Sequence, residues 1–470
     1  MRSRITEHTF YQYLKCPSWV AHDARAGHLE DALRARLQED GLLPEVERKL
    51  LASRNVVEIV EDDMDAAAVK TIEEMAKGVR SIYRGVLVHD HFVARPDLLE
   101  RVEGKSKFGN YYYVACDIKR SRHLKEEYKL QGCFYAEVLG LIQGLKPVQG
   151  YVMRTNGEIE SYLLEEAATH YHLTLDAIER ILDGEDEPHF LTSDCKQSPW
   201  FHECKKESVS CDDLSRLNRI WRSEVKEFNQ AGFSTVTDLA ALHPDLVASK
   251  VSGVTRDRLE FLHLQARALA EKRHFILRPV DLPPGDMALI VDVESDPLRD
   301  AHYLFGVLEV NGKDEKFHSF LAKDPKDEKK AWEDFIAFIR GYIGTPIYHY
   351  GWSEQEVFRS LGEKYGTDRE VLVMLEEQSV DLLVRLRECV VFPLSFYSLK
   401  DIAQYIGFRW RHDDASGLNS VLWFEEWLKS GNKQSLQDVI DYNEDDVRAT
   451  WALRNWALTN SGHGSAVSLR

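Results

Sequence analysis

Hydrophobic and polar residues alternate at helical and then at strand-like spacing along the chain, and this pattern predicts several α/β parts. Residues 1 to about 75 carry apolar side chains mostly at helical spacing. Strand-like runs fill 85–119, an amphipathic helix is expected at 127–142, and a strand follows at 147–154. We therefore expect an α/β domain that occupies residues 1–205.

Two further parts are expected after this domain. A polar, cysteine-bearing stretch leads into a purely helical pattern, which predicts a connector at 206–280. Three prolines between 279 and 284 mark the next boundary. Beyond it, apolar strand patterns and then helices predict a second α/β domain at 285–470. The fold class expected for the whole chain is α/β multidomain.

Composition and charge narrow the function. Hydrophobic residues make up 44% of the 470 residues, which excludes a mainly disordered chain. No apolar run is long enough for a membrane span, and no secretory signal is recognised, so we expect a cytoplasmic protein without a membrane partner. The net charge of −18 argues against binding nucleic acid by bulk attraction. Residues 101–150, however, hold nine Lys and Arg against five acids, a local excess of four.

The first group of candidate catalytic residues lies in the first domain. Asp117 and Lys119 end an apolar strand and, two residues apart, share one face of it. Asp97 ends an earlier strand segment, and Gln131 and Tyr135 lie four apart on the next helix. Two carboxylates and a lysine suit metal-assisted hydrolysis of phosphodiesters, because the acids hold Mg²⁺ while the lysine orients the nucleophile. The alternative for the Asp-x-Lys pattern alone is a solvated salt bridge.

Taken together, these five residues resemble the motifs of the RecB-family PD-(D/E)XK nucleases. The resemblance covers roughly residues 1–205 and implies a restriction-endonuclease-like domain. Relatives place a further His or Glu metal ligand in the first helices, and Glu45 or His28 is the candidate here. A surface role for either residue is the alternative.

The same resemblance suggests an iron–sulfur cluster, since some RecB-type nucleases bind one through four cysteines. Cys16, Cys195 and Cys204 match three of the positions, but Ser198 stands where the remaining cysteine is expected. Serine is a poor ligand for such a cluster. Either Cys211 completes a 4Fe–4S site or the cluster has been lost.

The second group of candidate catalytic residues lies in the C-terminal domain. Asp292 and Glu294 end a buried-type strand on one face, and Tyr442 and Asp446 lie one helical turn apart. Glu354 follows another strand end between them. Carboxylates in this number suit a site that holds two metal ions on either side of the scissile bond.

This order resembles that of the DEDD 3′–5′ exonucleases with an RNase H-like fold, particularly the YprB-like group. His349 stands where the family has asparagine, and Glu354 where it has aspartate. The resemblance implies Mg²⁺ or Mn²⁺ held by Asp292, Glu294, Glu354 and Asp446, and a tyrosine, Tyr442, that positions the water.

The helical connector resembles tandem helix-hairpin-helix elements, with Gly232 and Gly253 at the hairpins. Such elements offer backbone N–H groups to phosphates. Arg256 and Arg258 are therefore candidates for DNA contact, and a plain helical spacer is the alternative.

These patterns predict a metal-dependent nuclease with two candidate sites, acting on nucleic acid and most simply on single-stranded DNA. A helicase partner in trans fits the resemblance, because the chain contains no P-loop of its own. Two alternatives stay open, a nucleic-acid-binding or scaffolding subunit with degenerate sites and an RNA-directed 3′–5′ exonuclease. Repair, defence and spacer acquisition are all pathways that use such folds.

Overall fold

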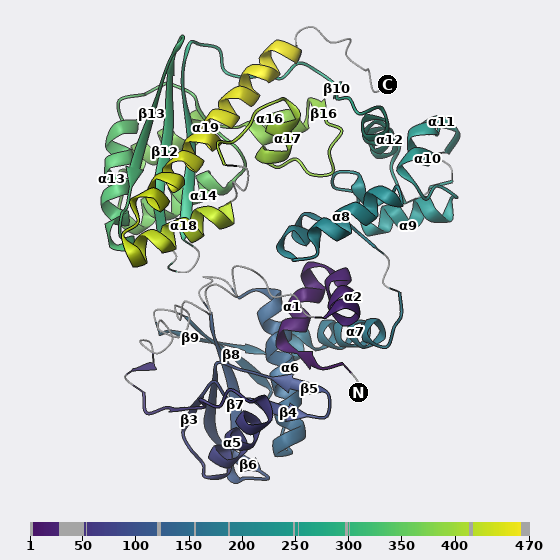
Figure 1. Cartoon of the computed structure of the whole chain (residues 1–470), viewed down its shortest axis with the longest axis vertical. Coiled ribbons are helices and arrows are strands. Elements are labelled where there is room, and N and C mark those ends of the chain that lie inside the picture. The colour runs from purple at the N-terminus through teal and green to yellow at the C-terminus, as the bar shows by residue number, and fades with distance from the viewer. Residues whose placement is uncertain are drawn as a thin grey trace. The chain divides into compact units, whose positions relative to one another are not determined.

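The chain forms two compact units, Met1–Glu207 and Ser208–Arg470 (Figure 1). The domain predicted at 1–205 lies in the first unit, and the segments predicted at 206–280 and 285–470 together make the second. The residues that the computed structural model describes are 3–27, 51–52, 54–119, 124–154, 157–186, 189–247, 250–251, 253–296, 299, 301–412 and 417–461.

The first unit is built on a six-stranded mixed sheet with the order β2-β3-β6-β7-β8-β9, beside a three-stranded sheet β1-β5-β4. Strands β6 and β7 pair antiparallel, whereas β7 and β8 pair parallel. A parallel pair needs a long crossover, and helix α6 supplies it. The strands are β1 (Ile5–Thr6), β2 (Val57–Glu58), β3 (Ser81–Tyr83), β4 (Leu87–His89), β5 (Phe92–Ala94), β6 (Leu98–Ser106), β7 (Gly109–Lys119), β8 (Gln149–Arg154) and β9 (Ile159–Leu163).

Helix α6 packs in the core of this unit, because Leu130, Phe134 and Val138 repeat every four residues and are fully buried. It ends at Gly144, whose φ of 74° is left-handed and whose N–H bonds to the carbonyl oxygen of Gly140. The helices of the unit are α1 (Glu7–Lys15), α2 (Pro17–Ala26), α5 (Met64–Ala76), α6 (Glu126–Gln143), α7 (Glu165–Leu182), the 3₁₀ helix η1 (Ser193–Gln197) and α8 (Phe201–Ser210), which runs into the second unit.

The second unit begins with the helical segment that the sequence predicts. Gly232 has a φ of 87° in the turn between α9 and α10, and Gly253 precedes α12 and donates its N–H to Glu227 Oε2 at 3.3 Å. The DNA-contact candidates have acidic partners, since Arg256 pairs with Asp245 and Glu260, and Arg258 pairs with Glu224. The helices are η2 (Leu214–Arg216), α9 (Arg222–Gln230), α10 (Val236–Ala241), α11 (Pro244–Val247) and α12 (Arg256–Glu271).

A five-stranded sheet with the order β13-β12-β11-β14-β15 forms the centre of the second unit. The first three strands are antiparallel, and β14 and β15 run parallel to β11. The short strand β15 was not predicted, and it ends at Asp381, whose carboxylate caps the next helix. The strands are β10 (Phe275–Ile276), β11 (Met287–Asp296), β12 (Ala301–Asn311), β13 (Asp314–Leu321), β14 (Ile347–His349), β15 (Ser379–Asp381) and β16 (Val390–Val391), with β10 and β16 forming a separate pair.

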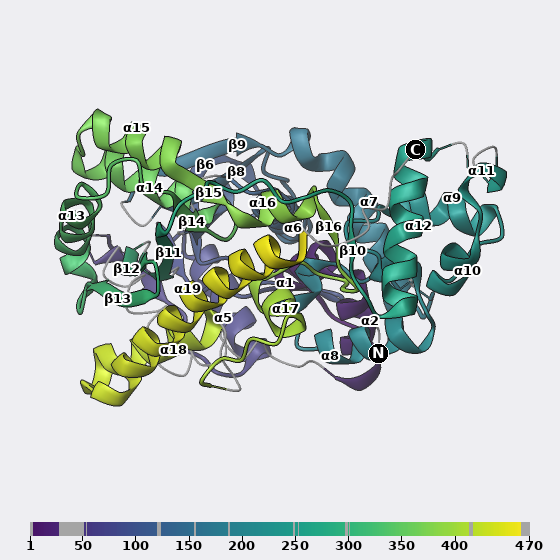
Figure 2. The ribbon, with the colours of Figure 1, turned by 90° about the horizontal axis from the view of Figure 1, so that it is seen from above.

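The long C-terminal helix α19 lies against β11 and β12 (Figures 1 and 2). Its buried side chains include Val439, Val447 and Leu453, which belong to two of the hydrophobic clusters of this unit. No helix within the described residues is both long and apolar enough to cross a membrane. The helices are η3 (Pro325–Asp327), α13 (Glu328–Ile339), α14 (Ser353–Tyr365), α15 (Arg369–Gln378), α16 (Leu382–Arg387), α17 (Leu399–Tyr405), α18 (Gly417–Ser430) and α19 (Lys433–Ser461).

Candidate active site

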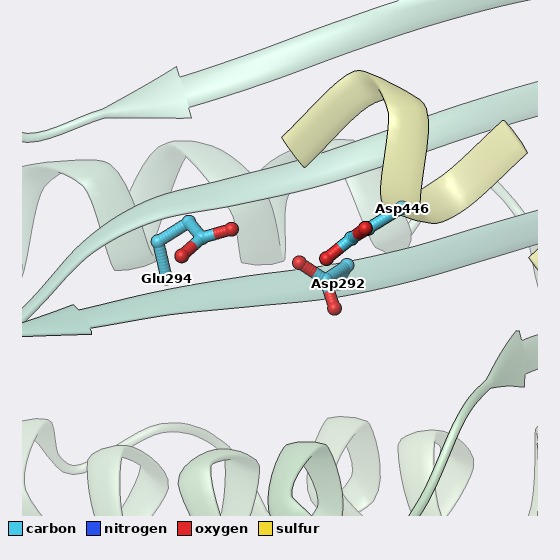
Figure 3. A group of neighbouring side chains, drawn as sticks. All are labelled: Asp292, Glu294 and Asp446. Carbon is cyan, nitrogen blue, oxygen red and sulfur yellow. The ribbon is translucent and has the colours of Figure 1, made fainter. Parts of the chain in front are cut away.

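Three carboxylates meet where α19 crosses strand β11. Asp292 and Glu294 project from the same strand, and Asp446 approaches them from the helix (Figure 3). One ligand oxygen from each of the three lies within 4.8 Å of the others. Glu294 is buried, while Asp292 and Asp446 are half-buried. Across the described part of the chain, this is the one group of three metal-ligating side chains that approach so closely.

Asn443 holds two of these carboxylates in place. Its Nδ2 donates to Asp292 Oδ2 at 2.7 Å and to Glu294 Oε1 at 3.5 Å. The residue was not predicted, although its position three residues before Asp446 puts it on the same face of α19. Because Asn443 is fully buried, it restricts the carboxylate geometry without carrying a charge.

Trp410 is the second polar partner that the sequence did not indicate. Its indole Nε1 donates to Asp446 Oδ1 at 2.7 Å. The neighbouring Arg411 donates to Asp445 through its backbone N at 2.8 Å and through Nε at 2.9 Å. These bonds tie the loop after α17 to α19 and thereby bring Trp410 to the site.

The pKa values of all three carboxyl groups are raised in this site. Burial, with the charge of Asp446 next in importance, raises the pKa of Glu294 to about 8. Burial also raises the pKa of Asp446 to about 7 and that of Asp292 well above its usual value. Carboxylates held together in a low-dielectric site are neutralised either by protons or by a cation between them. The donor set consists of carboxylate oxygens only, which fits Mg²⁺ or Mn²⁺.

The remaining predicted residues of this domain lie around the group of three. Burial and the nearby charge of Asp446 raise the pKa of Tyr442 far above its usual value. Glu354, which is buried, lies outside the close group, but its charge raises the pKa of Asp292. His349 donates from Nδ1 to Gly351 O at 2.6 Å. The metal-ligand role of Glu354 stays a prediction.

The side chain of Asn443 lies close to the backbone of Gly306. Gly306 on β12 pairs with Asp292 on β11. A Cβ on Gly306 would lie 1.6 Å from Asn443 Oδ1 and 3.1 Å from Phe317 Cε2, so the glycine leaves the space that the amide occupies.

Gly306→Ala is therefore expected to lower the free energy of unfolding by about 1–3 kcal/mol through overpacking. The loss should shrink markedly in an Asn443→Ala background, since the colliding amide is then absent. Urea unfolding of the four proteins measures this coupling. Gly417→Ala, at a position with nothing within 4 Å of the added methyl, is the matched control. An equal loss in both backgrounds contradicts the proposed contact.

The first predicted group also assembles, in the other unit. Asp117 Oδ2 accepts from Lys119 Nζ at 2.8 Å and from the Tyr135 hydroxyl at 3.4 Å. Asp97, just before β6, accepts from the backbone N of Ile118 at 2.7 Å. Burial lowers the pKa of Lys119, but the charges of Asp117 and Asp97 outweigh this and raise it, so the ammonium stays charged.

The side chain of Gln131 bonds to a different segment from the one that Tyr135 contacts. Its Nε2 donates to the backbone oxygen of Glu7 at 3.5 Å. Glu7 is a buried acid that sequence reasoning missed; its carboxylate pairs with Arg95 at 3.1 Å. Burial raises the pKa of Glu7, which Arg95 opposes and Asp117 reinforces. Glu45 and His28 lie outside the described residues.

Three of the four candidate cluster cysteines are buried in the first unit. Cys195 Sγ lies 3.3 Å from Cys16 Sγ, and Cys204 Sγ lies 3.5 Å from His22 Nε2. Ser198 Oγ accepts from the backbone N of Trp200 at 3.1 Å. Hydrogen bonding to Cys195 lowers the pKa of Cys16, but Cys204 and burial raise it to about 11.

Cys211, by contrast, is exposed and follows the end of α8. The buried set therefore offers three thiols and an imidazole in place of four thiols. This set differs from the four thiols that the resemblance implies, and the iron–sulfur cofactor stays a prediction.

One comparison with known proteins matches the region that contains Asp292, Glu294 and Asp446. The family model described as RNase_H superfamily matches residues 289–458, which contain all three close carboxylates. This part of the chain has an RNase H-like fold. A search of curated proteins gives no match.

Among solved structures, the family B DNA polymerase of Pyrobaculum calidifontis is similar at 21% identity with a TM-score of 0.30. The alignment covers 38% of this chain and 25% of the polymerase chain, so this protein spans about a quarter of the polymerase's length. The RNase H-like fold is shown for residues 289–458, which lie in the second unit. The RecB-like resemblance of the first unit stays a prediction.

Proposed function

We propose that the protein is a metal-dependent nuclease that hydrolyses phosphodiester bonds, with single-stranded DNA as substrate. The approach of Asp292, Glu294 and Asp446 to within 4.8 Å carries this proposal. Divalent ions bound by these carboxylates supply Lewis-acid activation of water and offset the charge of the leaving oxygen. Tyr442, whose pKa is raised by burial and by the nearby charge of Asp446, would orient the attacking water.

The polar partners keep this site in one geometry. Asn443 donates to Asp292 and Glu294, and Trp410 donates to Asp446. Such outer hydrogen bonds usually change metal affinity or activity by about 10–100-fold when they are removed. The arrangement suits removal of nucleotides from a 3′ end, which the exonuclease resemblance implies.

The Asp97, Asp117 and Lys119 group is proposed as a second nuclease site. Two acids that approach the same strand end, with a charged lysine 2.8 Å from one of them, suit a metal-bound water and a scissile phosphate. Tyr135 orients Asp117 through its hydroxyl. A helicase partner in trans and a cytoplasmic location belong to the same proposal.

A cleavage assay separates the two sites. Single-stranded DNA labelled at the 3′ end is incubated with Mn²⁺ and wild type, Asp292→Ala or Lys119→Ala, and a 5′-labelled strand is run in parallel. We expect Asp292→Ala to abolish release of the 3′ label as mononucleotide, and the double variant Asp292→Ala/Lys119→Ala to lose any cleavage that Asp292→Ala retains. RNA labelled in the same way tests the RNA-directed alternative.

The non-enzymatic alternative rests on one observation, that Glu354 lies outside the close carboxylate group. A scaffolding or binding subunit with degenerate sites needs no fourth ligand. If wild type cuts neither DNA nor RNA with Mg²⁺ or Mn²⁺, that alternative replaces the nuclease.

A further inference from the structure

A separate cavity in the second unit has the composition of a binding site. It encloses about 280 Å³ between the helical segment and the RNase H-like domain. Asn218 ties its two sides together by donating to the backbone oxygen of Ser395 at 2.9 Å. Trp221 and Phe261 contribute aromatic surface, and Arg219 and Arg387 contribute charge.

The two arginines lack a counter-ion within the described residues. Neither side chain has an ion pair or a hydrogen bond there, and Arg387 Nε is fully buried without a partner. Arg258, which also lines the cavity, is already neutralised by Glu224 at 2.7 Å. The charge of Asp381 acts on Arg387, but the Asp381 carboxylate caps α16. Two unpaired guanidiniums that face one cavity select an anion, and phosphate matches their planar donors.

Gln265 places a buried hydrogen-bond acceptor without a partner at the cavity. Its side chain lines the cavity and is only 3% exposed, and its Oε1 has no hydrogen-bond partner. A buried amide oxygen of this kind is costly unless the ligand brings a donor. An N–H of a nucleobase or a sugar hydroxyl satisfies it.

The aromatic side of the cavity is open to a flat ligand. Trp221, at the start of α9, is 63% exposed, which is high for so large an apolar side chain. Trp and Arg together form the usual stacking platform for bases of single strands. The volume lies near the lower end of the ~300–1,000 Å³ range of small-ligand sites, which fits one nucleotide unit and excludes a duplex.

We infer that this cavity binds one nucleotide unit of a single-stranded nucleic acid, with its phosphate on Arg219 and Arg387, its base against Trp221 and a donor group on Gln265. The inference rests on the proposed function only for the choice of a strand over a free nucleotide. The cavity then anchors the substrate strand outside the carboxylate site.

Fluorescence anisotropy of a short fluorescein-labelled oligothymidylate tests this with the full chain in EDTA, where hydrolysis is blocked. We expect Arg219→Gln and Arg387→Gln each to weaken binding about tenfold and to reduce the slope of log K against log salt by about 0.7. Trp221→Ala should weaken binding to a similar degree and leave the salt slope unchanged. Binding is read without cleavage, so a failed nuclease assay leaves the result intact.

The matched control is Arg385→Gln, which removes the same charge from the same helix at an exposed residue outside the cavity. Equal effects of Arg385→Gln and Arg387→Gln overturn the inference. Arg219 is exposed, so its variant is expected to fold even if the Arg387 variant does not. Thymidine monophosphate serves as competitor. If thymidine monophosphate displaces the oligothymidylate and binds as tightly as the oligothymidylate does, and if only the cavity variants fail to bind the monophosphate, the site takes a free nucleotide. The assignment to a strand is then wrong.

Discussion

Asp292→Asn is expected to lower the rate of 3′-end hydrolysis on the order of 10³-fold, with the fold unchanged. Metal-held charge stabilisation contributes several kcal/mol in sites of this kind, and each 1.36 kcal/mol is tenfold in rate. Asp292 is the residue to change, because it meets both Glu294 and Asp446 and accepts the 2.7 Å bond from Asn443. The asparagine keeps the shape but not the charge. Initial rates on 3′-labelled single-stranded DNA with saturating Mn²⁺ give the measurement.

Asp286→Asn is the control for this experiment. It removes an exposed carboxylate directly before the same strand, about six residues from the site, and should stay within twofold of wild type. A loss of less than tenfold in Asp292→Asn contradicts the assignment of hydrolysis to the carboxylate group.

Divalent cations are expected to raise the thermal unfolding midpoint more at pH 8 than at pH 5.5. The pKa of Glu294 is raised to about 8 and that of Asp446 to about 7, first by burial. In the metal-free protein, the native state therefore keeps protons that the unfolded state releases above about pH 4. This contribution to stability is complete below that pH and is lost as the pH rises towards 8. Cations replace the protons, so they have most to restore at high pH.

The expected size follows from mass action. At a metal concentration 100 times the Kd, binding adds about 2.7 kcal/mol to the free energy of unfolding. For a unit of this size the midpoint then rises by roughly 5–10 °C. Thermal scans with EDTA or Mn²⁺ at both pH values measure it, and Asp292→Asn should lose most of the shift. An equal shift at the two pH values, or an undiminished shift in the variant, contradicts metal binding by these carboxylates.

Much of the carboxylate site follows from local spacing. Two acids separated by one residue at the end of an apolar strand share a face, as Asp292 and Glu294 do. Asp446 and Tyr442 are one helical turn apart, and the charge of Asp446 acts on the pKa of Tyr442. The strands β11, β12, β13 and β14 were predicted from their apolar runs, whereas the three-residue strand β15 was not.

Contacts between distant segments escaped prediction for a different reason. Asn443 and Trp410 are ordinary polar and aromatic residues in the sequence, and only the packing of α19 on β11, together with the Arg411 bonds, brings them to the carboxylates. Glu7 likewise lies far from Asp117 along the chain, but its charge contributes to the same buried site.

The sequence by itself determined which residues are acidic, how they are spaced and which strand or helix carries them, because strand and helix periodicity depend on local backbone geometry. The tertiary structure decided how closely the acidic side chains approach one another and how far their pKa values are raised. It gathered three of the four predicted acids, left Cys211 exposed and placed two unpaired arginines beside a tryptophan. Distances and desolvation depend on how separate elements pack, and no local pattern encodes them.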